Sequence, residues 1–215
     1  CRILSYSNLE LHKKNDLYWL MGGSLNNAFF GINGDLEAFS LASYIAEIAD
    51  EISGENFPAH EVLQMTLNTL YAIENGLKPL WQIKATYELF AANISGFMPD
   101  LVTCRDCGKE SFEGELWLDV MNGAIVCPEC LSKKNGSLPV PETDRFETRN
   151  ILLPLDASAL AAMRYIATAP LKRIFAYGLS SKESADYLCR AAETYLLNHL
   201  ERGFDTLTFY HTVTK

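Results

Sequence analysis

The spacing of hydrophobic positions changes along the chain and separates strand-like from helical segments. Up to residue 32 the apolar residues partly alternate with polar ones, on either side of a polar turn at 13–16, which predicts short strands. From Asp35 onward they recur every three or four positions, as on one face of a helix. This spacing predicts helices at about 35–52, 59–75, 79–95 and 181–201. The sequence therefore predicts a mainly helical protein that is preceded by a few strands.

Residues that commonly cap helices mark two further ends. Asp156 is placed to cap a helix that follows it. Ser180 and Glu183 have the spacing of a capping box at the start of the last long helix. On the second helix we expect Leu63, Leu67 and Leu70 to face the core, because they repeat at helical spacing on its apolar side.

Four of the six cysteines form two tight pairs with a hairpin signal between them. The two pairs are Cys104 with Cys107 and Cys127 with Cys130. Between the pairs, Asn122-Gly123 separates two apolar runs, and both residues tolerate the positive φ of a type I′ turn. A hairpin here brings the second pair opposite the first. Four thiolates close a tetrahedral shell with no open position, which predicts one structural zinc ion.

Iron is an alternative that the spacing leaves open, because geometry alone does not separate four-thiolate zinc from four-thiolate iron. Cys107-Gly108 and Cys127-Pro128 are similar to rubredoxin loops, although Leu131 stands where rubredoxins usually have glycine. Four ordinary buried cysteines are the other alternative. Since the chain shows no secretory leader, metal binding in a reducing compartment is favoured over a disulfide framework.

The remaining residues give no signal of catalysis or of a membrane span. The four histidines are scattered, and none lies in a zinc-protease or nucleophile–base pattern. We therefore expect a non-enzymatic protein without catalytic residues. No apolar run approaches the roughly 20 residues that span a bilayer, so no membrane partner is expected.

The chain is acidic, with a formal net charge of −9 from 18 basic and 27 acidic residues. Because nucleic-acid binding depends on neutralising phosphates, this balance argues against a large DNA-binding surface. The acidity is concentrated between residues 35 and 103, so other surfaces can still be basic. The candidate DNA contacts are Lys13, Lys14, Arg105, Lys109, Lys133, Lys134, Lys172 and Arg173.

Two stretches of the sequence contain motifs that occur together in a known protein family. The first comprises NAFFGI at 27–32, DLEA at 35–38 and ASYIAE at 42–47. The second comprises YEL at 87–89, GFMPDL at 96–101 and CRDCG at 104–108. These motifs resemble those of RecO, a family of bacterial recombination-mediator proteins. Their order covers most of the chain, and the run that leads into the first cysteine pair is the most specific part.

The resemblance implies a fold with three parts: an N-terminal oligonucleotide-binding (OB) barrel, a helical domain and an inserted zinc ribbon. By this correspondence residues 1–33 are the last strands of the barrel, with its earlier strands missing from this chain. Residues 34–102 and 148–215 form the helical domain, and 103–147 form the zinc ribbon and a linker.

The resemblance also implies a function in recombinational DNA repair in the bacterial cytoplasm. RecO proteins bind single- and double-stranded DNA, anneal complementary strands, and bind RecR and the C-terminal tail of single-stranded DNA-binding protein. They help to load recombinase on single-stranded DNA, and no catalytic site is known in them. The net charge by itself favours a different function, a zinc-ribbon module that binds proteins and not DNA.

Overall fold

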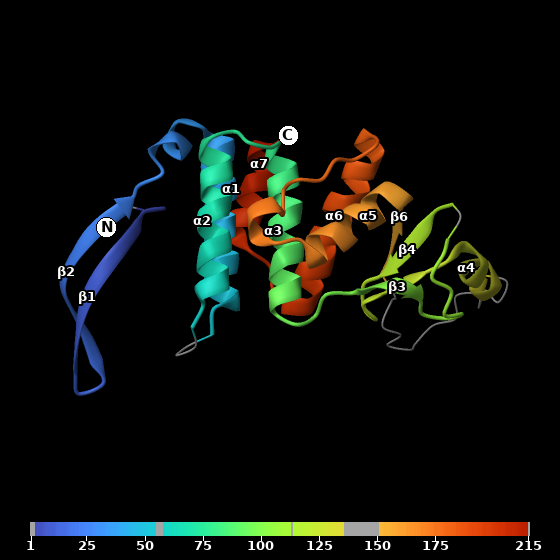
Figure 1. Cartoon of the computed structure of the whole chain (residues 1–215), viewed down its shortest axis with the longest axis horizontal. Helices are drawn as coiled ribbons and strands as arrows, with labels where there is room; N and C mark the ends of the chain where they lie inside the picture. The colour runs from blue at the N-terminus through green and yellow to red at the C-terminus, as the bar shows by residue number, and fades with distance from the viewer. Residues whose placement is uncertain (1–2, 55–57, 113, 136–150, 215) are drawn as a thin grey trace. The chain divides into compact units, whose positions relative to one another are not determined.

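The computed structural model describes residues 3–54, 58–112, 114–135 and 151–214. The chain divides into two compact units, Cys1–Leu80 with Phe204–Lys215 and Trp81–Gly203. Figure 1 labels their helices and strands.

The three-part division expected from the sequence stays a prediction, and most of its linker lies outside the described residues. None of the described helices is long and apolar enough to cross a membrane. The mainly helical fold with a few strands and a four-cysteine cluster is the one predicted from the sequence.

The first unit combines a β-hairpin with helices (Figure 1). Its elements are β1 (Tyr6–Lys14), β2 (Leu17–Asn27), the 3-10 helix η1 (Phe30–Gly34), α1 (Leu36–Ile52), α2 (His60–Glu74) and α7 (Asp205–Val213). Asp35 caps α1 because its side chain accepts hydrogen bonds from the backbone N–H groups of Glu37 and Ala38. α1 packs against both α2 and α7. The start of α1 is where the sequence predicts it, whereas α7 was not predicted.

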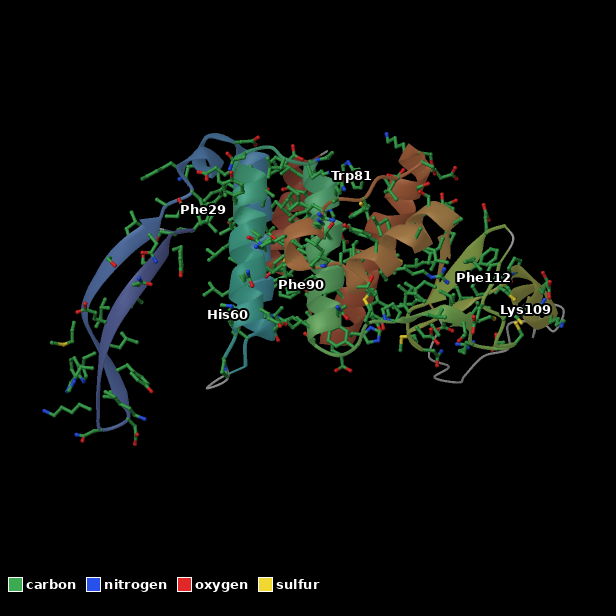
Figure 2. All side chains as sticks on the ribbon, viewed as in Figure 1. Phe29, His60, Trp81, Phe90, Lys109 and Phe112 are labelled. Carbon is green, nitrogen blue, oxygen red and sulfur yellow. The ribbon has the colours of Figure 1, made fainter. Side chains whose placement is uncertain are left out.

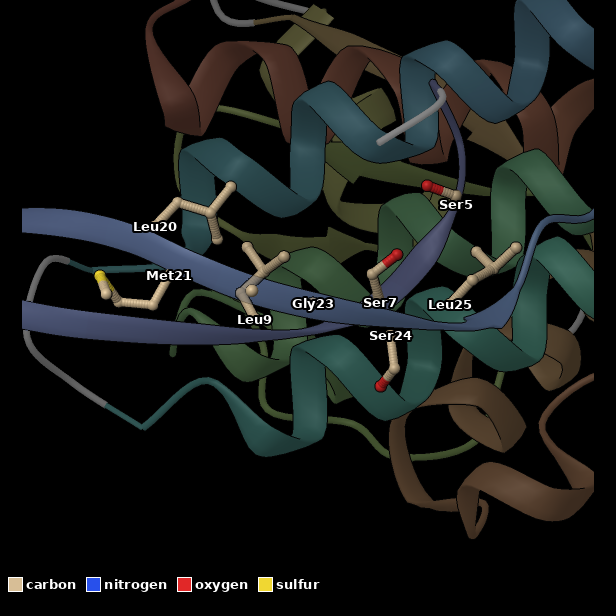
Figure 3. A pocket seen from close by; sticks show the side chains of 9 residues that line it. Ser5, Ser7, Leu9, Leu20, Met21, Gly23, Ser24 and Leu25 are labelled. Carbon is tan, nitrogen blue, oxygen red and sulfur yellow. The ribbon is translucent and has the colours of Figure 1, made fainter.

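β1 and β2 form an antiparallel hairpin whose side chains are largely exposed. Asn15 and Asp16 connect the strands with φ of 50° and 60°, the left-handed conformation that two-residue hairpin turns favour. On one face Leu9, Leu20 and Leu25 line a cavity of about 520 Å³ (Figure 3). Two strands cannot bury a core by themselves, which explains the exposure of these leucines.

The buried side of α2 lies beside the predicted one. Leu70 is buried, but Leu63 is 45% exposed and Leu67 is half-buried, whereas Val62 and Met65 are buried. The prediction that Leu63 faces the core was therefore wrong. Both sides of this helix carry apolar residues at helical spacing, so only the packing of the neighbouring helices selects one of them.

The second unit contains a four-stranded sheet and the remaining helices. Its elements are α3 (Leu80–Ile94), β3 (Asp100–Cys104), β4 (Leu116–Asp119), β5 (Ala124–Val126), α4 (Pro128–Asn135), β6 (Leu152–Leu155), α5 (Ala157–Thr168), the 3-10 helix η2 (Leu171–Arg173) and α6 (Lys182–Leu200). Helices α3, α5 and α6 lie where the sequence predicts helices.

The sheet has the strand order β3-β5-β4-β6. β3 runs parallel to β5, and the other neighbours are antiparallel. β6 follows the linker in sequence, yet Leu153 pairs with Leu118 of β4 and both side chains are buried. The chain before and after the linker therefore builds one sheet, a pairing that the sequence did not predict.

α3 is buried from Gln82 to Ala92, so its polar side chains need partners inside the unit. The Lys84 ammonium lies 2.7 Å from a carboxylate oxygen of Glu88 and 2.6 Å from one of Glu193 on α6. The Gln82 side-chain amide donates to the backbone carbonyl of Tyr177 at 3.1 Å. Figure 2 shows Trp81 and Phe90 among the side chains of this helix.

The start of α6 differs by one residue from the predicted capping box. The Ser181 hydroxyl accepts from the backbone N–H of Ser184, so Ser181 is the N-cap and not Ser180. Glu183 accepts a hydrogen bond from the Tyr187 hydroxyl and makes no capping contact. Either of two adjacent serines can serve as an N-cap, and the backbone selects the second, which lacks the capping-box partner.

Asp156 caps α5 as predicted and also joins it to the start of α6. Its side chain accepts from the backbone N–H of Ala159 at 2.7 Å and from the hydroxyl of Ser184. Replacing Asp156 with alanine is expected to lower the free energy of unfolding by about 1–2 kcal/mol, because both partners lose their acceptor. Urea denaturation measures the loss. Asp156→Asn is the matched control, since it keeps one acceptor oxygen and should lose less.

Candidate metal centre

Parallel pairing of β3 and β5 brings the two cysteine pairs together. Cys104 is the last residue of β3, and Cys127 follows directly after β5. Because parallel strands end at the same edge of a sheet, these two residues lie side by side, and the Cys127 N–H donates to the Cys104 sulfur at 3.4 Å. The second cysteine of each pair follows within one turn of chain.

A tight turn directs Cys107 back toward Cys104. The Cys104 carbonyl accepts from the N–H of Gly108 at 2.8 Å, and the Cys104 N–H donates to the carbonyl of Lys109 at 2.8 Å. Gly108 has φ of 70°, a conformation that favours glycine because it has no Cβ. Cys130 reaches the cluster differently, from the first turn of α4, which begins at Pro128.

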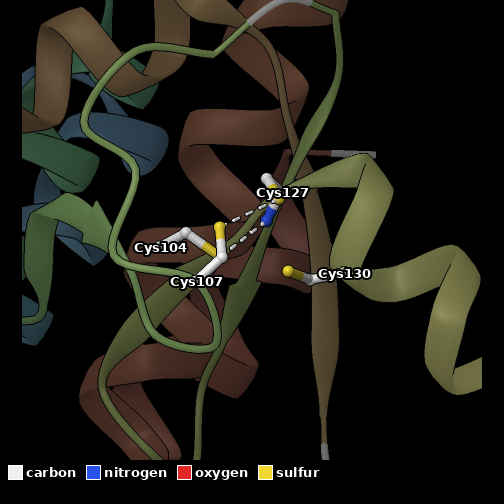
Figure 4. Close-up of side chains that lie close together, drawn as sticks. All are labelled: Cys104, Cys107, Cys127 and Cys130. Carbon is white, nitrogen blue, oxygen red and sulfur yellow. Dashed lines mark hydrogen bonds between the residues drawn. The ribbon is translucent and has the colours of Figure 1, made fainter.

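The four sulfur atoms fit one tetrahedral metal ion. All four lie within 4.8 Å of one another, and those of Cys107 and Cys127 are 3.8 Å apart (Figure 4). Zinc–sulfur bonds of about 2.3 Å in a tetrahedron put the sulfur atoms about 3.8 Å apart. Cys104, Cys127 and Cys130 are buried, whereas Cys107 is exposed. The cluster can therefore hold a metal ion through four thiolates, and zinc as its identity stays a prediction.

The local environment shifts the pKa values of the thiols in different directions. Burial opposes ionisation of Cys104, but hydrogen bonds from three backbone N–H groups, including that of Cys127, outweigh it and lower the pKa of Cys104 to about 6. Burial and the neighbouring thiols raise the pKa of Cys130 to about 12. A bound dication would supply the positive charge that favours all four thiolates.

Side chains of the second unit support the sheet that carries the cluster. Arg105 forms an ion pair with Asp119, which is fully buried on β4. The Tyr195 hydroxyl of α6 donates to the carbonyl of Phe97 at 2.6 Å. A Cβ at Gly123 would lie 2.7 Å from that hydroxyl, so the β4–β5 hairpin lies against α6.

The β4–β5 connection is a hairpin, as predicted, but its turn differs from the predicted type. Gly123 has φ of 57°, whereas Asn122 has negative φ. The Asp119 carboxylate accepts from both the backbone and side-chain N–H groups of Asn122. This contact holds Asn122 outside the left-handed region, so the turn is not type I′.

The residues predicted to contact DNA differ in whether they form ion pairs with nearby carboxylates. Arg105 pairs with Asp106 and Asp119, and Lys109 lies 2.7 Å from Glu129. Lys13 lies 3.5 Å from Asp16. The residues of the predicted set for which the described part of the chain shows no ion pair are Lys14, Lys133, Lys172 and Arg173. Lys134 lies with Lys133 on α4, and a DNA-binding role for all eight residues stays a prediction.

A cavity beside the cluster was not predicted. It has a volume of about 620 Å³ and is lined by Lys109, Phe112, Pro128 and Glu129, among others. Figure 2 labels Lys109 and Phe112 in this region. The lining comes from two segments that only the metal-binding turns bring together, so spacing in the sequence does not reveal it.

Comparison with known proteins supplies the family relationship. The family model described as "Recombination protein O C terminal" matches residues 33–145, more than half of the chain. The matched segment includes α1, α2, α3 and the four cysteines.

Curated relatives share this similarity at moderate identity. A protein of Acetivibrio thermocellus named "DNA repair protein RecO" is 25% identical over 214 residues, which cover 100% of this chain and 78% of the relative. A relative with the same name from Dehalococcoides mccartyi is 22% identical over 80% of this chain and 62% of its own length. One from Anaeromyxobacter sp. strain K is 31% identical over 73% of this chain and 59% of its own length.

Proposed function

Because the chain belongs to the RecO family of recombination proteins, we propose that it is a non-catalytic DNA repair protein of the bacterial cytoplasm. It binds and anneals DNA and helps to load recombinase on single-stranded DNA that is coated by its binding protein. Its partners are single- and double-stranded DNA, RecR and the C-terminal tail of single-stranded DNA-binding protein. The observation that carries the proposal is the family match over residues 33–145, which includes the four cysteines.

The metal-binding turns give the proposal a physical basis at the second unit. Cys130 lies in the first turn of α4, and Lys133 and Lys134 follow on the same helix. A zinc ion held by the four thiolates would fix the start of this helix and thereby the direction of the basic residues after it. Fixed cations lose little conformational entropy when they contact phosphates, so they bind DNA more effectively than mobile ones.

Annealing of complementary strands tests the proposal. We expect the chain to accelerate annealing of two labelled oligonucleotides and to bind single and double strands, with affinity falling as salt rises. The double variant Lys133→Ala, Lys134→Ala should bind single- and double-stranded DNA more weakly, to a similar degree. It should also lower the slope of log affinity against log salt by about 1–2. The loss of affinity in the double variant should not depend on the base sequence of the DNA, since phosphate contacts are the same at every base.

Lys182→Ala is the control for this experiment, because it removes an exposed lysine of the same unit outside the predicted set. It should leave affinity and salt slope unchanged. A chain that neither binds DNA nor contacts RecR or the single-stranded DNA-binding protein contradicts the proposal.

The acidic composition favours a second candidate function, a zinc-ribbon module that binds proteins without binding DNA. The formal net charge of −9 opposes phosphate binding over most of the surface. Salt dependence separates the two functions, because apolar docking to a protein changes little with salt while phosphate contacts weaken steeply. Retention of a partner protein without any DNA binding supports the second candidate.

A further inference from the structure

The two faces of the β1–β2 hairpin have opposite character. Cross-strand pairs share a face, and the register assigns every pair. One face, which we call the apolar face, carries the pairs Ser7–Leu25, Leu9–Gly23, Leu11–Leu20 and Lys13–Tyr18. The other, which we call the polar face, carries Asn8–Ser24, Glu10–Gly22, His12–Trp19 and Lys14–Leu17.

This pattern is that of an antiparallel ribbon with one face for packing and one for solvent. Leu9, Leu20 and Leu25, which line the cavity of Figure 3, belong to the apolar face, which is suited to being covered by other apolar groups. The polar face keeps its contact with water whether or not the apolar face is covered. A site on the polar face is therefore independent of what packs on the leucines.

Leu17 and Trp19 depart from this pattern near the tip of the polar face, and Trp19 is the aromatic one of the two. Its side chain is 57% exposed. His12 lies directly opposite on β1, and Lys14 and Glu10 are the two diagonal neighbours on the same face. Among the described residues Lys14 forms no ion pair, whereas Lys13 on the apolar face pairs with Asp16 and lies over the Tyr18 ring. An exposed indole thus lies across from an imidazole, with the ammonium group of Lys14 at the diagonal position toward the hairpin tip.

These three groups match the two chemical parts of an unpaired nucleotide. A base stacks on an indole ring with little regard to its identity, and the phosphates beside it accept hydrogen bonds from lysine and histidine side chains. In a duplex the faces of the bases are stacked on one another, so an aromatic side chain on a ribbon cannot reach them without unstacking. The geometry therefore favours a single strand over a duplex. Glu10, the diagonal neighbour on the side away from the tip, repels phosphate, so the phosphates beside the stacked base should lie toward Lys14 and the hairpin tip.

Resting on the DNA-binding function proposed above, we propose that Trp19 is a base-stacking residue that gives the chain its preference for unpaired DNA. Lys14 and His12 hold the flanking phosphates, and the strand lies across the polar face of the hairpin. The role of Trp19 is selectivity for single strands, whereas Lys14 contributes affinity for any nucleic acid.

Affinities of Trp19→Ala for two labelled DNAs test this inference. An oligothymidine of about 20 nucleotides is longer than one stacking site covers, and a blunt duplex of the same length has no unpaired base. Measured by fluorescence anisotropy, the affinity of the variant for the oligothymidine is expected to be about 5- to 150-fold lower than that of the wild type. Its affinity for the duplex should be unchanged. Lys14→Ala should weaken binding of both DNAs and lower the slope of log affinity against log salt by about 0.7 for the single strand.

Matched variants separate stacking from damage to the hairpin. Tyr18→Ala removes the neighbouring aromatic residue, 62% exposed, from the apolar face and should leave the preference for single strands intact. Trp19→Phe retains a smaller ring and should recover part of the lost affinity. Glu10→Gln removes a negative charge from the polar face and should strengthen binding. Stacking also quenches indole fluorescence, so oligothymidine should quench the wild type and leave Trp19→Phe unchanged.

Each outcome decides between the inference and the proposed function. Wild-type affinity of Trp19→Ala for oligothymidine overturns the stacking role while DNA binding stands. Equal losses in Trp19→Ala and Tyr18→Ala overturn it too, because they assign the effect to the whole hairpin. A wild-type chain that binds neither DNA overturns both. A loss confined to the single strand and to Trp19→Ala supports both.

Discussion

Replacing Cys107 with serine is expected to abolish stoichiometric metal binding by the chain. The sulfur of Cys107 lies 3.8 Å from that of Cys127 and completes a cluster in which all four sulfurs are within 4.8 Å. A serine hydroxyl is a poor ligand for zinc at neutral pH, so the shell loses one of its four thiolates. Mutation of a residue that only hydrogen-bonds to a metal ligand typically lowers metal affinity by about 10- to 100-fold. Loss of a ligand itself should lower it further.

Loss of the metal should loosen one end of the sheet and spare the rest of the second unit. Apart from the cysteines, the side chains of the turn at Gly108 and of the start of α4 are exposed or half-buried, and the ion pair that joins the two segments, Lys109 with Glu129, is exposed. In contrast, Leu118, Ile125 and Leu155 are buried between the strands and the helices. We therefore expect Cys107→Ser to become sensitive to proteases near 105–112 and 128–135 while its helical circular dichroism changes little.

Cys189→Ser is the matched control, because Cys189 is a free thiol on α6 outside the cluster. Elemental analysis of protein purified without added metal should find one zinc per chain in the wild type and in this control, and none in Cys107→Ser. Stoichiometric iron in the wild type, with the red colour of an iron–thiolate site, contradicts the zinc assignment. Cooperative unfolding of the whole unit in Cys107→Ser shows instead that the metal-binding turns are integral to the core.

The features that the sequence predicted well depend on neighbours within about one helical turn. Asp35 and Asp156 cap their helices through backbone N–H groups two or three residues away. The two cysteine pairs depend on the same short range, because two intervening residues suffice to turn one thiol toward the other. Such contacts form wherever the local backbone adopts the required conformation, so the local sequence pattern is enough to predict them.

The features that the sequence missed depend on which distant segments meet. Parallel pairing of β3 with β5 and the addition of β6 to β4 join segments on either side of loops that carry no pairing signal. Leu63 on α2 faces solvent because neighbouring helices selected the adjacent apolar side. The polar character around Trp19 likewise appears only once the register of β1 and β2 is known. Each case needs a partner that local spacing cannot identify.

Replacing Lys84 with methionine is expected to lower the free energy of unfolding of the second unit by about 3–5 kcal/mol. Burial by itself lowers the pKa of Lys84, but the carboxylates of Glu88 and Glu193 outweigh it and hold that pKa above its ordinary value. Lys84 is therefore charged inside the protein. Glu88 is fully buried on the same helix, so methionine leaves a buried carboxylate without this cation.

The position of the tryptophans allows this loss to be measured in one unit. Trp81 and Trp117 belong to the second unit and Trp19 to the first, so a Trp19→Phe background reports only on unfolding of the second. In urea, Lys84→Met should unfold at lower concentration than the background. Adding Glu88→Gln should recover part of the loss, because a neutral amide costs less to bury than an unpaired carboxylate. Glu193→Gln alone should cost less than Lys84→Met, since water reaches the Glu193 side chain. A loss below about 1 kcal/mol in Lys84→Met, with no recovery from Glu88→Gln, contradicts the central role of this ion pair.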